Sequence, residues 1–179
     1  MTNSIKILSL LLIFTLLSCE SKQASFFKTF EKQFEAEIEK EGAKLFKFQY
    51  DPFSPQSSYF LNSKMKYLKV HLSGELETSI SLIKFENDSI VNIVEHFTIY
   101  EGNDGGRTAG RDLNKLEGDT IYVYDYKNSN FKSFVNKKLY KTSNKEFSNG
   151  GIISDNKKWI YNLKRETEQN IIKNKLWKK

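Results

Sequence analysis

Two arginines in a glycine-rich stretch are the first residues whose type and spacing suggest chemistry. Arg107 and Arg111 lie four positions apart within residues 101–118, which we expect to form the longest loop of the chain. Arginine offers a rigid fork of donors for a carboxylate or phosphate, and glycines let backbone N–H groups approach an anion. The stretch is therefore a candidate anion or acidic-glycan site. It has no phosphate-loop or EF-hand spacing, and the alternative is a connector whose arginines pair with its own acidic side chains.

Three tyrosines form the second candidate site. Tyr122, Tyr124 and Tyr126 alternate along a predicted strand, so they share one face of it. Such a row can stack on sugars or on a peptide. The alternative is aromatic packing between strands, which stabilises a sheet by about 0.2–1 kcal/mol per pair. Ile121 and Val123 point to the other face, which we expect to be the core side.

The remaining reactive residue types do not form a catalytic pattern. The two histidines, His71 and His96, lie on predicted strands without the H-x-H or H-E-x-x-H spacing of a metal site. No G-x-S-x-G nucleophile motif is present. We therefore expect no catalytic residues, no metal and no cofactor, and we interpret the chain as a non-enzyme.

Cys19 is the residue with the strongest signal. Lys6 precedes an apolar run over residues 7–17, which is too short to span a membrane and is typical of a secretory signal peptide. The run ends in Leu16-Leu17-Ser18-Cys19, which resembles the lipobox of bacterial lipoproteins. In that family the cysteine thiol receives a diacylglycerol, and the chain is cut before the cysteine. The resemblance covers only about the first 20 residues.

The resemblance implies a location as well as a modification. Residues 1–18 would be removed, residues 19–25 would form a lipidated tether, and the membrane would be the first partner. Several acyl chains on one residue anchor a protein stably. Glu20 is not the aspartate that retains well-studied lipoproteins in the inner membrane, which favours the outer membrane facing the periplasm. The alternative is an ordinary secretory signal with an incidental cysteine.

Charge is distributed unevenly along the chain. Residues 19–126 have a net charge of −5, whereas residues 127–179 have a net charge of +10. A basic final third suits anionic headgroups or an acidic partner. Export and the lack of a recognition motif argue against nucleic acid. The alternative interpretation is that the lysines line solvated strand edges, where they prevent edge-to-edge pairing.

The first element that could position the candidate site residues is a helix near the N-terminus. Residues 26–41 carry an apolar stripe at spacings of three and four, made by Phe27, Phe30, Phe34 and Ile38. Ser25 could cap this helix at its start, and Gly42 is a natural stop. We expect the stripe to pack on a sheet.

Alternating apolar residues predict strands over most of the remaining chain. Asn87-Asp88 suits a tight hairpin turn. Glu95 interrupts the apolar face of its strand, and we favour a bulge that lets it escape over a buried carboxylate. Residues 164–179 fit a helix or a strand equally. The predicted strands are residues 44–50, three strands within 65–100, 119–126, 131–141 and 157–163.

The sequence therefore predicts one α+β domain over residues 26–179. Its sheet would be mainly antiparallel and curled or partly closed, with the N-terminal helix packed on it. We interpret the chain as a membrane-anchored binding module of the cell envelope, with a protein or envelope polymer as partner; an immunity-type lipoprotein is one form of this class. The alternative is a carrier or sensor of a lipid or other apolar ligand. A continuous apolar pocket of about 300 Å³ or more would favour the carrier.

Overall fold

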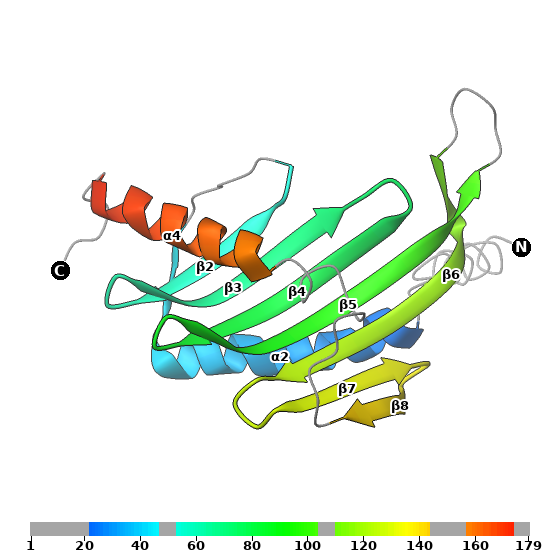
Figure 1. Cartoon of the computed structure of the whole chain (residues 1–179), viewed down its shortest axis with the longest axis horizontal. Coiled ribbons are helices and arrows are strands. Elements are labelled where there is room, and N and C mark those ends of the chain that lie inside the picture. Colours follow the sequence, from blue (N-terminus) through cyan, green and yellow to red (C-terminus); the bar gives the residue numbers. More distant parts are fainter. Residues whose placement is uncertain (1–21, 47–52, 104–109, 144–156, 174–179) are drawn as a thin grey trace, which may run out of the picture.

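The structure is a computed structural model that describes residues 22–46, 53–103, 110–143 and 157–173. At residues 22, 103, 110–114 and 173 it describes the backbone only. Within these ranges, two helices lie on opposite faces of one curved sheet (Figure 1). This arrangement confirms the predicted α+β class with an antiparallel sheet. Of the two predicted shapes, curled or partly closed, partial closure is wrong, because the curved sheet is open.

In the part of the chain that the structure describes, eight antiparallel strands follow one another in chain order across the sheet. Because every connection joins neighbouring strands, the topology is a simple meander with β1 and β8 at its edges. The three strands predicted within residues 65–100 are confirmed as β3, β4 and β5. The strands are β1 (Lys44–Phe46), β2 (Gln56–Leu61), β3 (Lys64–Ser73), β4 (Glu77–Glu86), β5 (Ser89–Asn103), β6 (Gly110–Asp125), β7 (Asn130–Val135) and β8 (Lys138–Ser143).

Three hairpins turn through two residues that both have positive φ. Asn87 and Asp88 have φ of 47° and 64°, which confirms the predicted turn. Asn62-Ser63 and Asn136-Lys137 adopt the same conformation. The prediction of a single strand over residues 131–141 is wrong, because this last turn divides it into β7 and β8. A lysine is an unusual residue at positive φ, so the sequence does not predict a turn at Asn136-Lys137.

Helix α2 (Lys22–Glu41) covers the convex face of the sheet, and its predicted stripe is confirmed. Phe27 and Ile38 are buried, and Gly42 ends the helix with a φ of 68°. The start of the helix differs from the prediction. Because α2 begins at Lys22, Ser25 lies inside the helix and does not cap it.

Helix α4 (Lys157–Lys173) crosses the concave face, where a strand over residues 157–163 was predicted. The alternation of Trp159, Tyr161 and Leu163 suggested that strand, but it is incidental. The residues that α4 buries follow helical spacing instead, and two of them are polar, which weakens the helical pattern in the sequence. They are Ile160, Leu163, Lys164, Thr167 and Ile171.

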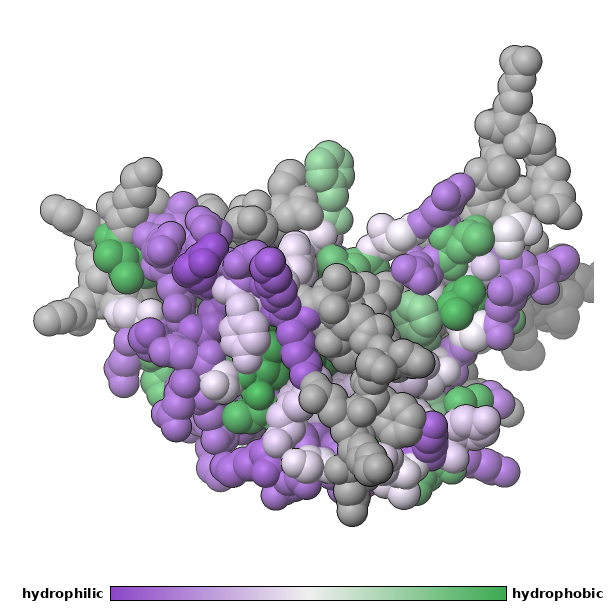
Figure 2. Space-filling view, in the orientation of Figure 1, coloured by the Kyte–Doolittle hydropathy of each residue, from purple (hydrophilic) through white to green (hydrophobic). Residues whose placement is uncertain are grey.

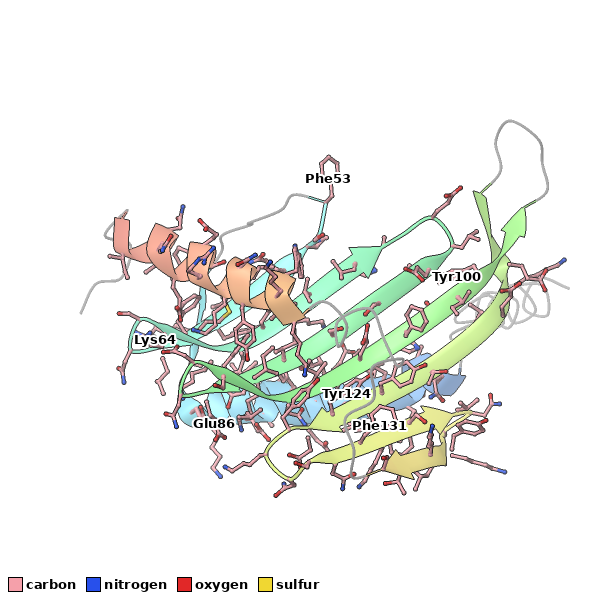
Figure 3. The ribbon with its side chains drawn as sticks, viewed as in Figure 1. Phe53, Lys64, Glu86, Tyr100, Tyr124 and Phe131 are labelled. Carbon is pink, nitrogen blue, oxygen red and sulfur yellow. The ribbon has the colours of Figure 1, made fainter. Side chains whose placement is uncertain are left out.

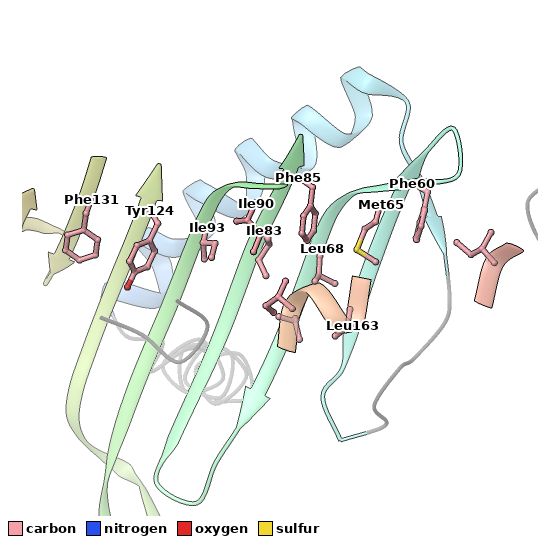
Figure 4. Packing of buried hydrophobic residues seen from close by; sticks show 13 residues of the cluster. Phe60, Met65, Leu68, Ile83, Phe85, Ile90, Ile93, Tyr124, Phe131 and Leu163 are labelled. Carbon is pink, nitrogen blue, oxygen red and sulfur yellow. The ribbon is translucent and has the colours of Figure 1, made fainter. Parts of the chain in front are cut away.

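Each face of the sheet has its own packed cluster. Under α2, Leu82, Val94 and Ile121 contact the phenylalanines of the helix. On the concave face a larger cluster runs from Phe60 to Phe131 beneath α4 (Figure 4). Because strand residues alternate between two covered faces, the central strands are apolar on both sides.

Two further predictions about β5 and β6 are wrong. The predicted loop over residues 101–118 is largely the end of this hairpin, since β5 extends to Asn103 and β6 begins at Gly110. Glu95 does not escape through a bulge. It pairs regularly with Ser81 and Tyr122, and its exposed fraction is 0%.

Candidate binding groove

An open groove of about 370 Å³ lies between helix α2 and the ends of strands β4, β5 and β6 on the convex face. It forms because a straight helix covers only part of a twisted sheet. The lining comes from four elements and the β6–β7 turn. Its residues are Phe30, Gln33, Phe34, Glu37, Leu82, Lys84, Glu86, Val91, Asn92, Val94, Val123, Asp125, Lys127 and Asn128.

The floor of the groove is apolar. Leu82 and Val94 are nearly buried, and Val123 is half-buried beside them. Phe30 and Phe34 of α2 form the wall, because they belong to the same stripe that packs the helix on the sheet. The groove is therefore an uncovered margin of the α2 cluster, and its floor can accept apolar side chains from outside.

The rim of the groove carries ion pairs of both signs. Lys84 Nζ lies 2.8 Å from Glu37 Oε2, so it joins β4 to α2. Lys127 Nζ lies 3.2 Å from Glu86 Oε2 and joins the β6–β7 turn to β4. Both pairs are partly exposed, so each contributes little to stability, about 0–1 kcal/mol. Their charges stay accessible to a partner.

The pKa values of Lys84 and Asp125 are shifted in the directions that favour their charged forms. Burial works against the charge of Lys84, but the hydrogen bond and the negative charge of Glu37 outweigh it, so the Lys84 pKa is raised. A hydrogen bond from the Asn128 amide lowers the pKa of Asp125. The groove therefore combines an apolar floor with charged side chains of both signs. This combination suits the recognition of a polypeptide, and the lining residues include no nucleophile beside a base.

The tyrosine row lies on the opposite face from this groove. Tyr122, Tyr124 and Tyr126 line the concave face, and Tyr124 is only 2% exposed (Figure 3). Tyr124 stacks on Tyr126 with a centroid distance of 6.1 Å, and Tyr122 stacks on Phe131. Lys157 of α4 lies 4.1 Å from the Tyr126 ring centroid. These contacts are aromatic packing between neighbouring strands, which was the alternative to a binding role, and they place Tyr124 in the core.

The arginine candidates contribute no described side chain. Arg107 lies outside the described residues, and Arg111 is placed by its backbone only, paired with Gly102 at the far end of the β5–β6 hairpin. The sequence-predicted anion site is therefore neither assembled nor brought near the groove by the part of the chain that the structure describes.

A buried polar group lies beside the tyrosines. Ser79 Oγ donates a 2.5 Å hydrogen bond to Glu95 Oε1, and Ser81 is fully buried next to them. Burial raises the pKa of Tyr122; a hydrogen bond with Thr120 opposes this shift, and the charge of Glu95 adds to it. The only sequence signal for this group was the carboxylate that interrupts an apolar strand face.

The two histidines have different hydrogen-bond partners. His96 Nε2 lies 2.8 Å from Asp119 Oδ1 under the start of α2, with its ring 5.2 Å from that of Phe27. His71 lies on β3 beside Ser73. Among the described residues no group of three or more histidine, cysteine or acidic side chains could hold a metal.

Comparisons of the chain with protein-family models, with curated proteins and with solved structures found no match. None of the helices in the described ranges is both long and apolar enough to cross a bilayer.

Proposed function

We propose that the protein is a lipid-anchored binding module of the bacterial cell envelope without enzymatic activity. Cys19 carries the lipid and tethers the domain to the outer membrane, facing the periplasm. The groove beside α2 binds an extended polypeptide segment that presents an apolar side chain between charged ones. An immunity-type role, in which the bound polypeptide belongs to a toxin, is one form of this function.

The observation that carries the proposal is the composition of the groove. Its floor is apolar, with Leu82 and Val94 nearly buried and Val123 half-buried. Four charged side chains ring it: Glu37, Lys84, Glu86 and Lys127. Protein interfaces combine an apolar centre with a polar rim in this way. The carrier alternative needs a continuous apolar cavity. The apolar side chains of both faces instead pack into two clusters, which favours the binding module.

The lipid anchor is tested by replacing the modified residue. Cys19→Ala removes the only thiol of the chain, so we expect no incorporation of labelled fatty acid and accumulation of an unprocessed precursor. The measurement is metabolic labelling followed by electrophoresis of the membrane fraction. Cys19→Ser serves as a second variant with a side chain of similar size. Undiminished labelling of either variant would contradict the anchor.

The groove is tested by site-specific photo-crosslinking of the lipidated protein in intact cells. A benzophenone side chain in place of Gln33 projects from the groove wall, so we expect a discrete adduct of fixed mass with one polypeptide. The matched control places the same group at Lys32, which is exposed and does not line the groove. Equal adducts from both positions, or none from Gln33, would contradict a binding role for the groove.

A further inference from the structure

The hairpin of β7 and β8 is the most basic surface of the described chain that also exposes apolar side chains. Residues 130–143 contain four lysines and no acidic residue. Leu139 and Tyr140 are 54% and 77% exposed on the edge strand β8. Figure 2 shows hydrophilic and hydrophobic surface side by side over this corner of the molecule. The exposed lysines are Lys132, Lys137, Lys138 and Lys141.

The start of helix α2 is fixed to this hairpin. The buried amide of Gln23 donates a hydrogen bond to the carbonyl of Phe134 and accepts one of 2.7 Å from the backbone N–H of Lys137. The ring of Phe26 packs edge-on against the ring of Phe134, with 5.5 Å between the ring centroids. Figure 1 shows the blue start of α2 beside the end of β7 and the start of β8. The hairpin and the first turn of α2 therefore form one firmly connected corner.

The length of the tether puts this corner close to the lipid anchor. Between Cys19 and Lys22 there are three Cα–Cα steps, which span at most about 11 Å. The headgroup layer on one side of a bilayer is itself about 5–7 Å thick. If Cys19 is lipidated as proposed above, the hairpin cannot stand far from the membrane surface.

We propose that the β7–β8 hairpin binds the anionic lipid surface and orients the domain on its membrane. Lysines near such a surface each increase the association about fivefold. Tyrosine is enriched at the level of the headgroups, where its ring is buried and its hydroxyl stays hydrated. The inference rests on the proposed lipid anchor and adds a second contact to it.

An acidic peptide that pairs with the outer edge of β8 would use the same charges. The lipid surface is favoured because the short tether holds the hairpin beside it, whereas a peptide has no such constraint. Pairing of β8 with a second copy of the chain would place lysine-rich strands side by side, which the charges oppose.

The test uses the processed, lipidated protein in vesicles that carry a nitroxide on some headgroups. A fluorophore is attached at Thr142→Cys on β8 or, as the matched control, at Lys44→Cys on the opposite edge of the sheet. In vesicles rich in phosphatidylglycerol we expect several-fold stronger quenching at residue 142 than at residue 44. High salt, and the combined variant Lys137→Glu, Lys138→Glu and Lys141→Glu, should remove the difference.

A charge-matched variant separates this effect from net charge. Lys32→Glu, Lys44→Glu and Lys158→Glu change the same number of exposed lysines elsewhere, and with the fluorophore at residue 142 the quenching should stay strong. Equal quenching at both positions would overturn the inference, as would a change in the probe at residue 142 on adding polyglutamate but not lipid. In those cases the protein still remains on the vesicles. Failure of the anchor itself is distinct, because the protein would then leave the vesicles altogether.

Discussion

Lys164 carries the buried charge that joins helix α4 to the end of the sheet. Its ammonium lies 2.8 Å from Asp88 in the β4–β5 turn and 2.7 Å from Glu168 one helical turn later. Glu168 also accepts a 2.9 Å hydrogen bond from the backbone N–H of Met65. The side chain of Lys164 is 6% exposed. Lys164 and Glu168 together therefore join the helix to the β4–β5 turn and to strand β3.

Lys164→Ala should be among the most destabilising single changes on the concave face. It leaves the nearly buried Glu168 carboxylate without its cation, and breaking a buried pair in this way costs about 3–5 kcal/mol. The measurement is the free energy of unfolding from urea titration at pH 7. Arg165→Ala is the control, because Arg165 is exposed and pairs only loosely with Glu166; it should change stability by no more than about 0.5 kcal/mol.

The same cluster sets a pH dependence. The hydrogen bond from Lys164 is the largest cause that lowers the pKa of Asp88 in the folded state, followed by the hydrogen bond from Lys64. A lowered folded pKa means that the stabilisation is present above the unfolded value of about 3.9 and is lost as pH falls through the folded value. The cost of Lys164→Ala should therefore shrink at acidic pH. A cost that stays constant down to pH values below about 3 would contradict this account.

Single residues also show how far the sequence could predict this structure. Asn87-Asp88 was recognisable as a turn because both residue types tolerate positive φ. Glu95 was not predictable in the same way. A buried carboxylate is costly without a partner, so the sequence favours a bulge that exposes Glu95. The partner is Ser79, which lies sixteen positions earlier and donates a hydrogen bond to Glu95 in the folded protein.

At the scale of elements, the β7–β8 turn is held in a conformation that its sequence does not favour. Lys137 has a φ of 64°, and a non-glycine residue in this region costs about 1 kcal/mol. Lys137→Gly should relieve that cost and stabilise the protein by roughly 0.5–1 kcal/mol. The measurement is thermal unfolding followed by circular dichroism. The backbone N–H that bonds to Gln23 is kept in this variant.

The neighbouring position gives a matched control. Lys138 is the first residue of β8 and pairs with Val135 in the ladder, so Lys138→Gly should destabilise by about 0.5–1 kcal/mol because glycine loses more conformational freedom in a strand. Both variants remove one lysine from the same hairpin. If both changed stability in the same direction, the effect would come from charge and not from backbone conformation.

The two described helices differ in how easily they can be predicted from the sequence. In α2 the buried positions are phenylalanines and an isoleucine, so the period of the helix was visible. In α4 the buried positions include Lys164 and Thr167, which make tertiary contacts that no local pattern contains. The candidate groove was hidden for the same reason. Of its lining, only Phe30 and Phe34 stood out in the sequence, and the floor comes from Leu82, Val94 and Val123 on strands that follow much later in the chain.

At the scale of the whole molecule, the sheet stays open because each of its faces is covered separately. Helix α2 covers the convex face and α4 covers one end of the concave face. Closure into a barrel would need β1 to pair with β8, and β1 has only three residues. The molecule therefore buries two thin apolar layers in place of one central cavity, which favours the binding module that we propose over the carrier.

Two filled layers predict that the protein carries no apolar cargo. A carrier keeps a cavity that its ligand occupies, and such pockets enclose most of the ligand surface. The groove beside α2 has the volume of a small pocket, but charged side chains ring it. Native mass spectrometry of the lipidated protein, purified in mild detergent, should give the mass of the chain plus its covalent lipid. The Cys19→Ser protein, which would keep residues 1–18, should give the mass of the unprocessed chain without that lipid. A further apolar molecule at a fixed stoichiometry in both preparations would contradict the filled layers and restore the carrier. Its absence, together with an adduct at Gln33, would leave the groove as the surface through which the molecule acts.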